Sequence, residues 1–170
     1  PAVVEATIAE KGDNLIRGFE ALVDDIEAGG TRLRLRMSDE TAFEVGKDLA
    51  TAEGSVVFEN DLIQLIQFAP TTPEVARRPL LFVPPWINKY YILDLRPKNS
   101  FIQWAVAQGH TVFCISWVNP DESMRGLTFE DYLKKGTLAA IDAVEQATGE
   151  REMNLLAYCL GGTLTAATLA

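Results

Sequence analysis

The sequence predicts an α/β fold, and three observations lead to this class. Three short apolar runs occupy residues 79–83, 111–118 and 152–159, and such runs are typical of strands that are covered on both faces. Longer segments with helical spacing of their apolar residues lie between the runs. Strands that alternate with helices in this way form a parallel sheet with helices on both of its faces.

The chain before this alternation is expected to form a separate helical N-terminal region, residues 1–52. Its clearest helix covers residues 14–28, where apolar side chains recur on one helical face. These side chains are Leu15, Phe19, Leu22, Val23 and Ile26. Gly29 and Gly30 follow and are a natural end for the helix.

A basic alternation follows this helix in the stretch TRLRLRMS, where Arg32, Arg34 and Arg36 alternate with apolar residues. The pattern indicates a short strand or an extended arm. The three guanidinium groups could bind the phosphates of a nucleotide-like substrate. We favour the simpler interpretation, a solvated face beside acidic neighbours.

Residues 53–170 are expected to form the first part of the α/β domain. The domain should open with a β-hairpin, because the strand-like segments 55–60 and 62–70 meet at the turn-prone pair Asn60-Asp61. The helix after the first apolar run should begin at Ser100, where Ser100 to Gln103 resembles a capping box. The next helix should begin at Thr128 and end at Gly149, with Leu133, Thr137, Ala140, Ile141 and Val144 as its buried stripe.

Composition narrows the class of function. A formal net charge of −9 argues against a nucleic-acid partner, because phosphates require a basic surface. No apolar run reaches the ~18 to 20 residues that a membrane span needs. The two cysteines, Cys114 and Cys159, lie in apolar runs and suggest no disulfide framework, so we expect a cytoplasmic protein.

The last of the apolar runs ends in the pattern of a nucleophile elbow. The stretch AYCLGG places Cys159 between the small residues Ala157 and Gly161 and runs directly into a helix-forming segment. Such a turn lifts the central side chain above the sheet edge and points the first N–H groups of the helix at it, which favours a thiolate and an oxyanion. Gly162 should add further room. The elbow refines the fold class to the α/β-hydrolase type; in the alternative, Cys159 is a core cysteine in a tight turn.

The second donor of an oxyanion hole should come from the loop VPPWINKYY, which follows the first strand of the α/β series. Pro84 and Pro85 have no N–H group, so the donor is expected at Trp86 or Ile87. The same loop supplies the candidate walls of a substrate pocket, which are Trp86, Asn88, Tyr90 and Tyr91. In the alternative, this aromatic loop only packs for stability.

A cysteine nucleophile needs a histidine base that an acid orients. The single histidine, His110, precedes the cysteine and opens a strand, whereas α/β-hydrolases place the histidine after the nucleophile. We therefore interpret His110 as structural and expect Cys114, in the middle of a strand, to serve packing alone. The base and the acid are expected beyond Ala170, which would make the chain a fragment truncated after the nucleophile helix.

Several motifs in the right order resemble the polyhydroxyalkanoate synthases. They are VPPWINKYYILDL, GHTVFCISWVNPD, TFEDY and AYCLGGTL, joined by DETAFEVGKDLA and VVFENDLIQLIQFAP in the N-terminal part. The form INKYYILDL is similar to the class I, short-chain type. The box of this family usually reads Gly-x-Cys-x-Gly-Gly, and here Ala157 replaces the first glycine.

The resemblance implies an acyltransferase that polymerises (R)-3-hydroxyacyl-CoA into a storage polyester and releases CoA. It further implies that Cys159 carries the acyl group, that the amide of Leu160 binds the oxyanion, and that no metal or cofactor takes part. Expected partners are the acyl-CoA, the growing polyester and, for the full-length protein, a second copy in a homodimer. The expected location is the surface of polyester granules in the cytoplasm.

Two other functions are compatible with the same residues. A polyester depolymerase or thioesterase on this fold can also use a cysteine, and fold alone does not separate it from a synthase. A granule-associated module that retains an inactive elbow is the non-enzymatic alternative. Polymer formation or release of the free acid from 3-hydroxybutyryl-CoA would distinguish the two enzymes, and a downstream sequence without the Asp and the His would support the module.

Overall fold

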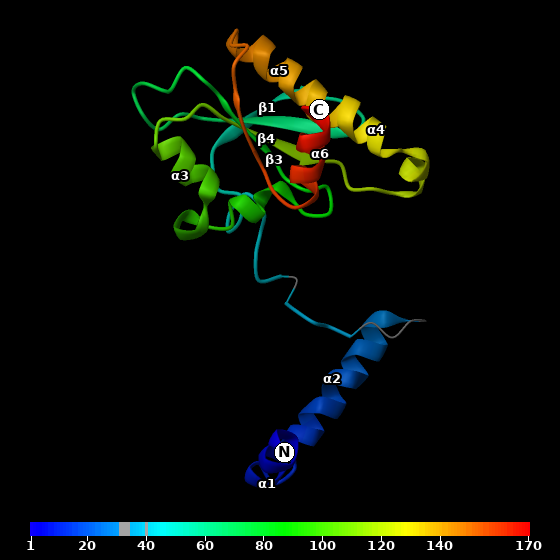
Figure 1. The fold of residues 1–170 in the computed structure, drawn as a ribbon. Coiled ribbons are helices and arrows are strands. Elements are labelled where there is room, and N and C mark those ends of the chain that lie inside the picture. The colour runs from blue at the N-terminus through cyan, green and yellow to red at the C-terminus, as the bar shows by residue number, and fades with distance from the viewer. Residues whose placement is uncertain (31–34, 40) are drawn as a thin grey trace. The chain divides into compact units, whose positions relative to one another are not determined.

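The computed structural model describes residues 1–30, 35–39 and 41–170. Contacts within the chain divide it into two compact units, Pro1–Ala42 and Phe43–Ala170 (Figure 1). The division falls earlier than the boundary at residues 52 and 53 that the sequence suggested. Residues just before that boundary join the second unit because the N–H groups of Ala50 and Ala52 donate hydrogen bonds to Asp94.

The first unit contains two helices, α1 (Ala2–Ala9) and α2 (Asp13–Gly29). Helix α2 is the expected helix, and it ends at the glycine pair as predicted. The apolar residues of its expected face are all exposed in the structure as described, from Val23 at 36% to Phe19 at 67%.

The basic alternation is described only in part, because Arg32 and Arg34 lie outside the described residues. Arg36 is described, and its Nε donates to Oδ1 of Asp25 at 2.6 Å, while a terminal nitrogen lies 3.2 Å from Oδ2 of Asp24. Both carboxylates belong to α2. Arg36 therefore lies beside acidic neighbours at the end of this helix, in agreement with the simpler interpretation for this one arginine.

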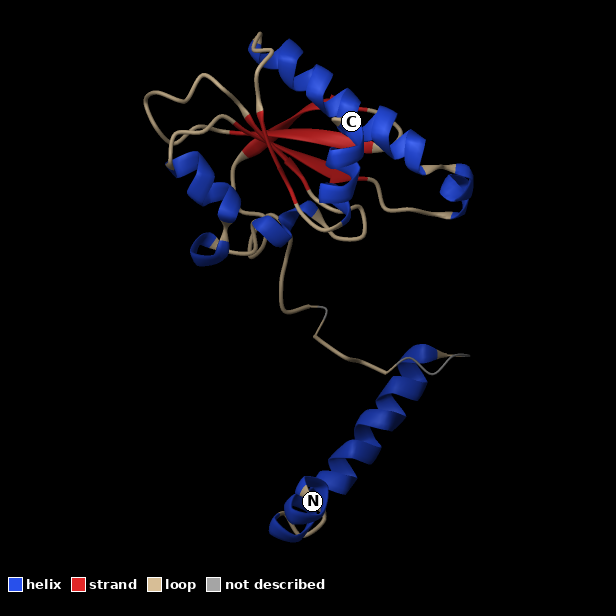
Figure 2. Cartoon of the chain, viewed as in Figure 1, coloured by secondary structure: helices blue, strands red, loops and turns tan. Residues whose placement is uncertain are grey.

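The second unit is built on one five-stranded sheet in the order β1-β2-β4-β3-β5 (Figure 2). The hairpin strands pair antiparallel, and β2 pairs antiparallel with β4, whereas β4, β3 and β5 run parallel to one another. The strands are β1 (Gly54–Glu59), β2 (Ile63–Phe68), β3 (Leu80–Val83), β4 (Val112–Trp117) and β5 (Asn154–Ala157). The predicted hairpin and the three apolar strands are confirmed.

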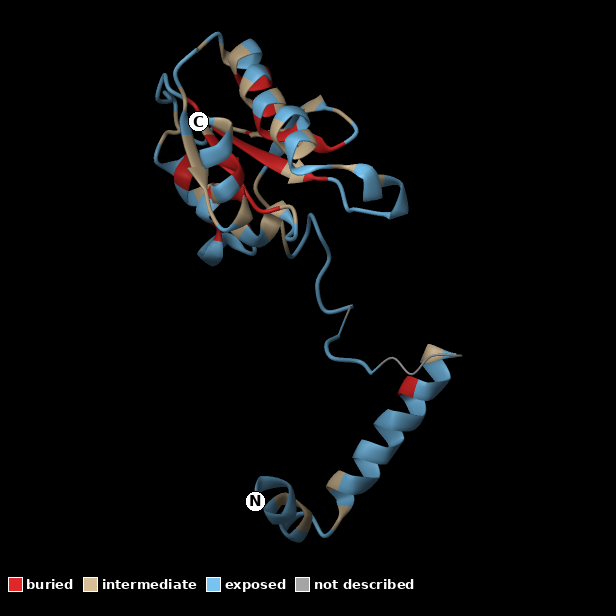
Figure 3. Ribbon diagram, turned by 45° about the vertical axis from the view of Figure 1, so that its right-hand side comes forward, coloured by how far each residue is buried: buried red, intermediate tan, exposed pale blue. Residues whose placement is uncertain are grey.

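Helices cover both faces of this sheet, and each face has its own apolar core. On one face α3 (Phe101–Ala107) packs through Ile102, Ala105 and Val106. On the other face lie α5 (Ala139–Thr148) and α6 (Leu160–Thr168). The buried residues gather on the central strands and on the inner sides of the helices (Figure 3). This arrangement confirms the α/β class.

The predicted capping box at Ser100 forms only in half. Ser100 Oγ accepts a hydrogen bond from the N–H of Gln103 at 2.9 Å. The Gln103 side chain does not return to Ser100; it donates instead to Thr51 at 2.9 Å and to Asp94 at 3.0 Å. The buried carboxylate of Asp94 is the stronger acceptor, and it draws the amide away from the helix end.

The helix predicted from Thr128 to Gly149 is continuous but not uniform. It starts as α4 (Phe129–Asp131), widens into the π-helical segment η4 (Tyr132–Leu138) and continues as α5 up to Gly149, which has a left-handed φ of 72°. The sequence predicted a regular α-helix here. Three short 3₁₀ turns complete the unit: η1 (Tyr90–Leu93), η2 (Pro97–Asn99) and η3 (Glu122–Gly126). Among the described residues, no helix has both the length and the apolar character that a membrane crossing requires.

Candidate active site

Cys159 lies at the sharp turn between β5 and α6, as the sequence predicted. Its backbone has φ 54° and ψ −131°, a conformation that L-residues rarely adopt. The side chain is exposed and the thiol is free. The helix begins at the next residue, Leu160. The strained turn thus presents a thiol at the carboxyl end of the parallel strands, which is where open α/β sheets bind ligands.

Gly161 allows α6 to begin this close to the sheet. A Cβ atom at Gly161 would lie 2.1 Å from the carbonyl oxygen of Val83 and 2.9 Å from the carbonyl carbon of Pro84. No side chain fits there. Gly162 has ordinary space, because a Cβ atom would lie 3.8 Å from the carbonyl oxygen of Ala157. The expectation that Gly161 must be small is confirmed, and at Gly162 a side chain would meet only ordinary contacts.

The first turn of α6 follows directly on Cys159. The N–H groups of Gly162 and Thr163 bond to the carbonyl oxygen of Cys159 at 3.0 and 3.2 Å. No backbone hydrogen bond of the described residues has the N–H of Leu160 as its donor, and the first N–H groups of a helix have no acceptor within it. This amide is therefore available to an anionic group next to Cys159.

The loop after β3 starts beside the first turn of α6, because Pro84 contacts Gly161. Pro84 and Pro85 are buried, Trp86 is half-buried, and Ile87 and Asn88 are exposed. Within the described residues, the N–H groups of Trp86 and Ile87 donate to no backbone carbonyl. The backbone N–H of either residue is thus free of backbone acceptors among the described residues, and the sequence predicted the second oxyanion donor at one of the two.

A cavity of about 420 Å³ opens beside this loop. It is lined by Trp86, Ile87, Asn88, Lys89, Trp117, Asn119 and Pro120. The Trp86 ring forms one wall and packs against Tyr132, with 4.9 Å between ring centroids. Of the expected pocket residues, Trp86 and Asn88 therefore share a cavity.

Tyr90 and Tyr91 do not line that cavity. They contact each other edge to face, with centroids 5.6 Å apart, and Tyr90 packs on the core beneath α3. Burial is the main cause that raises the pKa of Tyr90, and Cys114 and Asp94 add to it. Burial likewise raises the pKa of Tyr158, the residue before the elbow. Tyr90 thus lies on the α3 face of the sheet.

His110 is remote from the elbow in the topology, and Cys114 lies in the middle of β4. His110 precedes β4, whereas Cys159 follows β5, and these strands run in the same direction on either side of β3. The six residues of β4, at about 3.3 Å each, place the amino ends of the parallel strands roughly 20 Å from their carboxyl ends. The N–H of His110 closes α3 by donating to Ala105. Cys114 is fully buried, and burial raises its pKa far above the usual range.

The sequence analysis missed the residues that hold the loop in place. Trp117, at the end of β4, donates its indole N–H to the carbonyl oxygen of Pro84 at 2.7 Å. Gly136 lies against the ring of Trp117. Two signals were available: a tryptophan with a polar N–H at the carboxyl end of a parallel strand, and a glycine inside an otherwise helical pattern.

Two known families match this chain, and the two matches overlap at residues 78–105. Residues 1–105 match the family described as the poly-beta-hydroxybutyrate polymerase (PhaC) N-terminus. Residues 78–170 match the alpha/beta hydrolase fold. The second match begins just before β3, the first strand of the parallel part of the sheet.

Curated relatives match the whole chain. A poly(3-hydroxyalkanoate) polymerase of Methylorubrum extorquens is 55% identical over 170 residues, which cover 100% of this chain and 28% of the relative. The polymerase subunits PhaC of Rhizobium meliloti (strain 1021) and of Cupriavidus necator are 51% and 45% identical, with the same shares of 100% and 28%. The chain thus spans little more than a quarter of the length of these relatives. With the family match over its first 105 residues, the chain belongs to the poly-beta-hydroxybutyrate polymerase (PhaC) N-terminal family, continued by the start of an α/β-hydrolase fold.

Proposed function

We propose that this chain contributes the nucleophile and the oxyanion hole of an acyltransferase that polymerises (R)-3-hydroxyacyl-CoA into a polyester. The observation that carries the proposal is the backbone of Cys159, with φ 54° and ψ −131° at the first turn of α6. A fold maintains such strain where a reacting group needs it. Membership of the polymerase family supports this chemistry over the others that such an elbow allows.

The first proposed step is a thioester exchange. The Sγ thiolate of Cys159 attacks the acyl carbonyl carbon, the carbonyl oxygen becomes an oxyanion, and the CoA thiolate leaves and takes up a proton. The step exchanges one thioester for another, so its free energy change is small. The N–H of Leu160 and that of Trp86 or Ile87 donate to the oxyanion.

The second proposed step forms the ester bond. The hydroxyl oxygen of a 3-hydroxyacyl chain attacks the thioester at Cys159, loses its proton to a base, and releases the Cys159 thiolate. We propose that a histidine and an acid located beyond Ala170 supply this base, because His110 lies at the opposite end of the parallel strands from Cys159. The ring of Trp86 limits the access of water to the thioester, because hydrolysis of the thioester would end the chain.

The test compares two cysteine variants of a full-length polymerase that carries this sequence, assayed with 3-hydroxybutyryl-CoA. We expect Cys159→Ala to abolish both CoA release and polymer formation while thermal unfolding stays unchanged. Cys114→Ala is the matched control and should keep its activity, with a loss of ~1 to 3 kcal/mol in the free energy of unfolding. Activity retained in Cys159→Ala would refute the proposal.

The product identifies the reaction class. Polymer supports the synthase, whereas free 3-hydroxybutyrate without polymer would indicate a thioesterase or a depolymerase. Neither product from the unmodified full-length protein would indicate a granule-associated module without catalysis. We also propose, from family membership alone, that the full-length protein forms a homodimer and acts at the surface of polyester granules in the cytoplasm.

A further inference from the structure

We propose that Trp117 is a positioning residue that sets the second oxyanion donor by holding the carbonyl group of Pro84. The inference rests on the proposed function of Cys159. It adds the hydrogen bond that fixes the loop at Trp86 and Ile87. Trp117 lies at the end of β4, and nothing in its position on the strand requires a polar N–H.

The carbonyl oxygen of Pro84 is held from two sides. The indole N–H of Trp117 donates to it at 2.7 Å, and both groups are buried. On the other side stands Gly161, whose added Cβ atom would lie 3.0 Å from the same oxygen. A single carbonyl group therefore joins the end of β4, the loop after β3 and the first turn of the nucleophile helix.

This hydrogen bond ties the start of the loop to a neighbouring strand near the elbow. Pro84 and Pro85 have no N–H group, so their backbone can be held through carbonyl groups only. The Pro84 carbonyl is held by Trp117, and the Pro85 carbonyl accepts from Asn88 within the loop. The direction of the next N–H groups, at Trp86 and Ile87, thus depends on the indole of Trp117.

The indole ring is itself fixed by its neighbours. Its centroid lies 6.2 Å from that of Trp86 and 5.6 Å from that of Tyr132, both in aromatic contact. Gly136 closes the remaining side so tightly that an added Cβ atom would lie 2.4 Å from Cη2 of the ring. Trp117 is only 8% exposed, so the ring has one position available.

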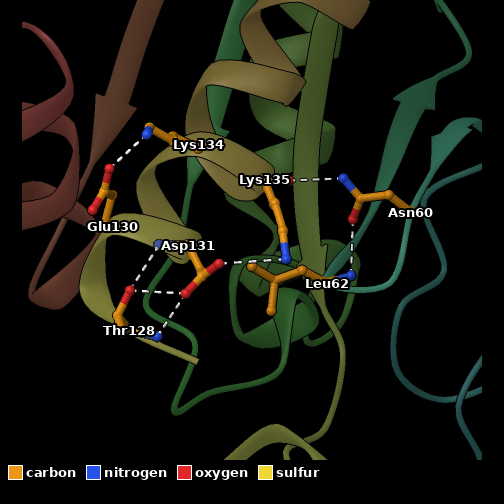
Figure 4. A network of polar contacts seen from close by, with 7 residues as sticks. All are labelled: Asn60, Leu62, Thr128, Glu130, Asp131, Lys134 and Lys135. Atoms are coloured by element: carbon orange, nitrogen blue, oxygen red, sulfur yellow. Dashed lines mark hydrogen bonds and ion pairs between the residues drawn. The ribbon is translucent and has the colours of Figure 1, made fainter. Parts of the chain in front are cut away.

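The π-helical segment η4 explains why Gly136 meets the ring. A π-helical turn is wider than an α-helical turn, and such turns occur frequently at functional sites. Its backbone is held from the hairpin: Asn60 Nδ2 donates to the carbonyl oxygen of Lys135 at 2.8 Å, while Asn60 Oδ1 accepts from Leu62 (Figure 4). The carbonyl group directly before Gly136 is thus bound to another part of the sheet.

Contacts at the start of the helix hold the π-helical segment η4 from its amino-terminal side. Lys135 Nζ lies 3.3 Å from Oδ1 of Asp131, and Oδ2 of Asp131 accepts hydrogen bonds from Thr128 at 2.8 and 2.9 Å (Figure 4). The chain of contacts therefore runs from the hairpin and the helix cap through Gly136 and Trp117 to Pro84, and ends beside Cys159.

The test removes the indole N–H and leaves the ring in place. In the full-length polymerase, replacing Trp117 with 3-benzothienylalanine keeps the bicyclic shape and exchanges the N–H for sulfur; Trp117→Phe is the simpler variant. A misplaced oxyanion donor should lower kcat for CoA release roughly 10- to 100-fold. KM and the rate at which iodoacetamide alkylates Cys159 should stay unchanged, because neither depends on the oxyanion. Trp104→Phe is the control, since Trp104 is an exposed tryptophan on α3, and it should match the unmodified enzyme.

A double-mutant cycle tests the proposed path. Gly136→Ala keeps the indole but displaces it, so it should lower kcat like the loss of the N–H, and the two changes together should cost no more than the larger one alone. Unchanged kcat in the benzothienylalanine enzyme, or effects that multiply in the double variant, would overturn the proposal. Failure of the proposed function gives a different result, because Cys159→Ala would then retain activity whatever Trp117 does.

Discussion

At the scale of single residues, the elbow combines a strained residue with a glycine that accommodates it. The backbone of Cys159 is held at φ 54°, at a cost of about 1–3 kcal/mol for an L-residue outside its favoured regions. Gly161 lets the backbone of α6 contact Val83 and Pro84 directly. Because this contact fixes the start of the helix, Cys159 cannot relax without moving α6.

We expect Gly161→Ala to destabilise the second unit by about 1–3 kcal/mol through overpacking and to lower polymerase activity. Its Cβ atom would meet backbone atoms at 2.1 and 2.9 Å, and backbone cannot rotate away. Gly162→Ala is the control, and it should be neutral or slightly stabilising, since alanine favours the helix. Thermal unfolding of the two full-length variants measures the difference. Equal stabilities would show that α6 can shift without cost.

At the scale of the element, the helix from Phe129 to Thr148 owes the geometry of its first turns to two sets of contacts. A capping box joins Thr128 and Asp131 at its start and satisfies N–H groups that lack a helical acceptor. The π-helical segment follows at once, where Asn60 binds the carbonyl group of Lys135. The cap sets the direction of the helix, and the side chain from the hairpin stabilises the wide turn.

The capping box predicts how the pKa of Asp131 responds to substitution of its partners. Hydrogen bonds from the backbone and side chain of Thr128, with a smaller effect of Lys135, lower the pKa of Asp131 to about 2. Because this pKa lies below the ordinary value of 3.8, the cap contributes its full stability above about pH 4 and loses it as the pH falls through about 2. Thr128→Ala should raise the pKa of Asp131 toward its ordinary value, and Lys135→Gln should raise it less. Carboxyl NMR titration measures both; a larger effect of Lys135→Gln would assign the shift to the ion pair.

At the scale of the second unit, a buried carboxylate holds the segment that leads into the sheet. Asp94 is fully buried, and its Oδ2 accepts from the N–H of Ala52 at 2.8 Å while its Oδ1 accepts from Gln103 at 3.0 Å. Its backbone carbonyl also accepts from the N–H of Ala50. Segments that lie far apart in the chain thus share one acceptor group, which explains why residues 43–52 belong to this unit.

We expect Asp94→Ala to lower the free energy of unfolding by about 1–3 kcal/mol, because it leaves buried donors without acceptors. Asp94→Asn should cost less, since its amide keeps one oxygen. Asp142→Ala, an exposed carboxylate on α5, is the control and should change the stability by less than about 0.5 kcal/mol. Denaturant unfolding provides the values. If Asp94→Ala matched the control, the carboxylate would not hold the segment.

Local patterns in the sequence determined most of the elements and the position of the elbow. Continuous apolar runs predicted β3, β4 and β5, and the pair Asn60-Asp61 predicted the hairpin, because strand burial and turn chemistry are local preferences. The small residues around Cys159 placed it at a strand-to-helix turn, since only small residues permit that backbone. The same motifs carried the resemblance to the polymerase family.

Only the tertiary structure decided how these elements hold the elbow loop. The carbonyl of Pro84 meets the indole of Trp117 because β3 and β4 are neighbours in the sheet, and no local pattern in the sequence encodes that distance. Likewise, Gln103 leaves its capping position for Asp94, and the helix widens at Lys135 because Asn60 reaches it from the hairpin. Local propensities select elements, whereas contacts between residues far apart in the sequence depend on packing, and packing exists only once the sheet is assembled.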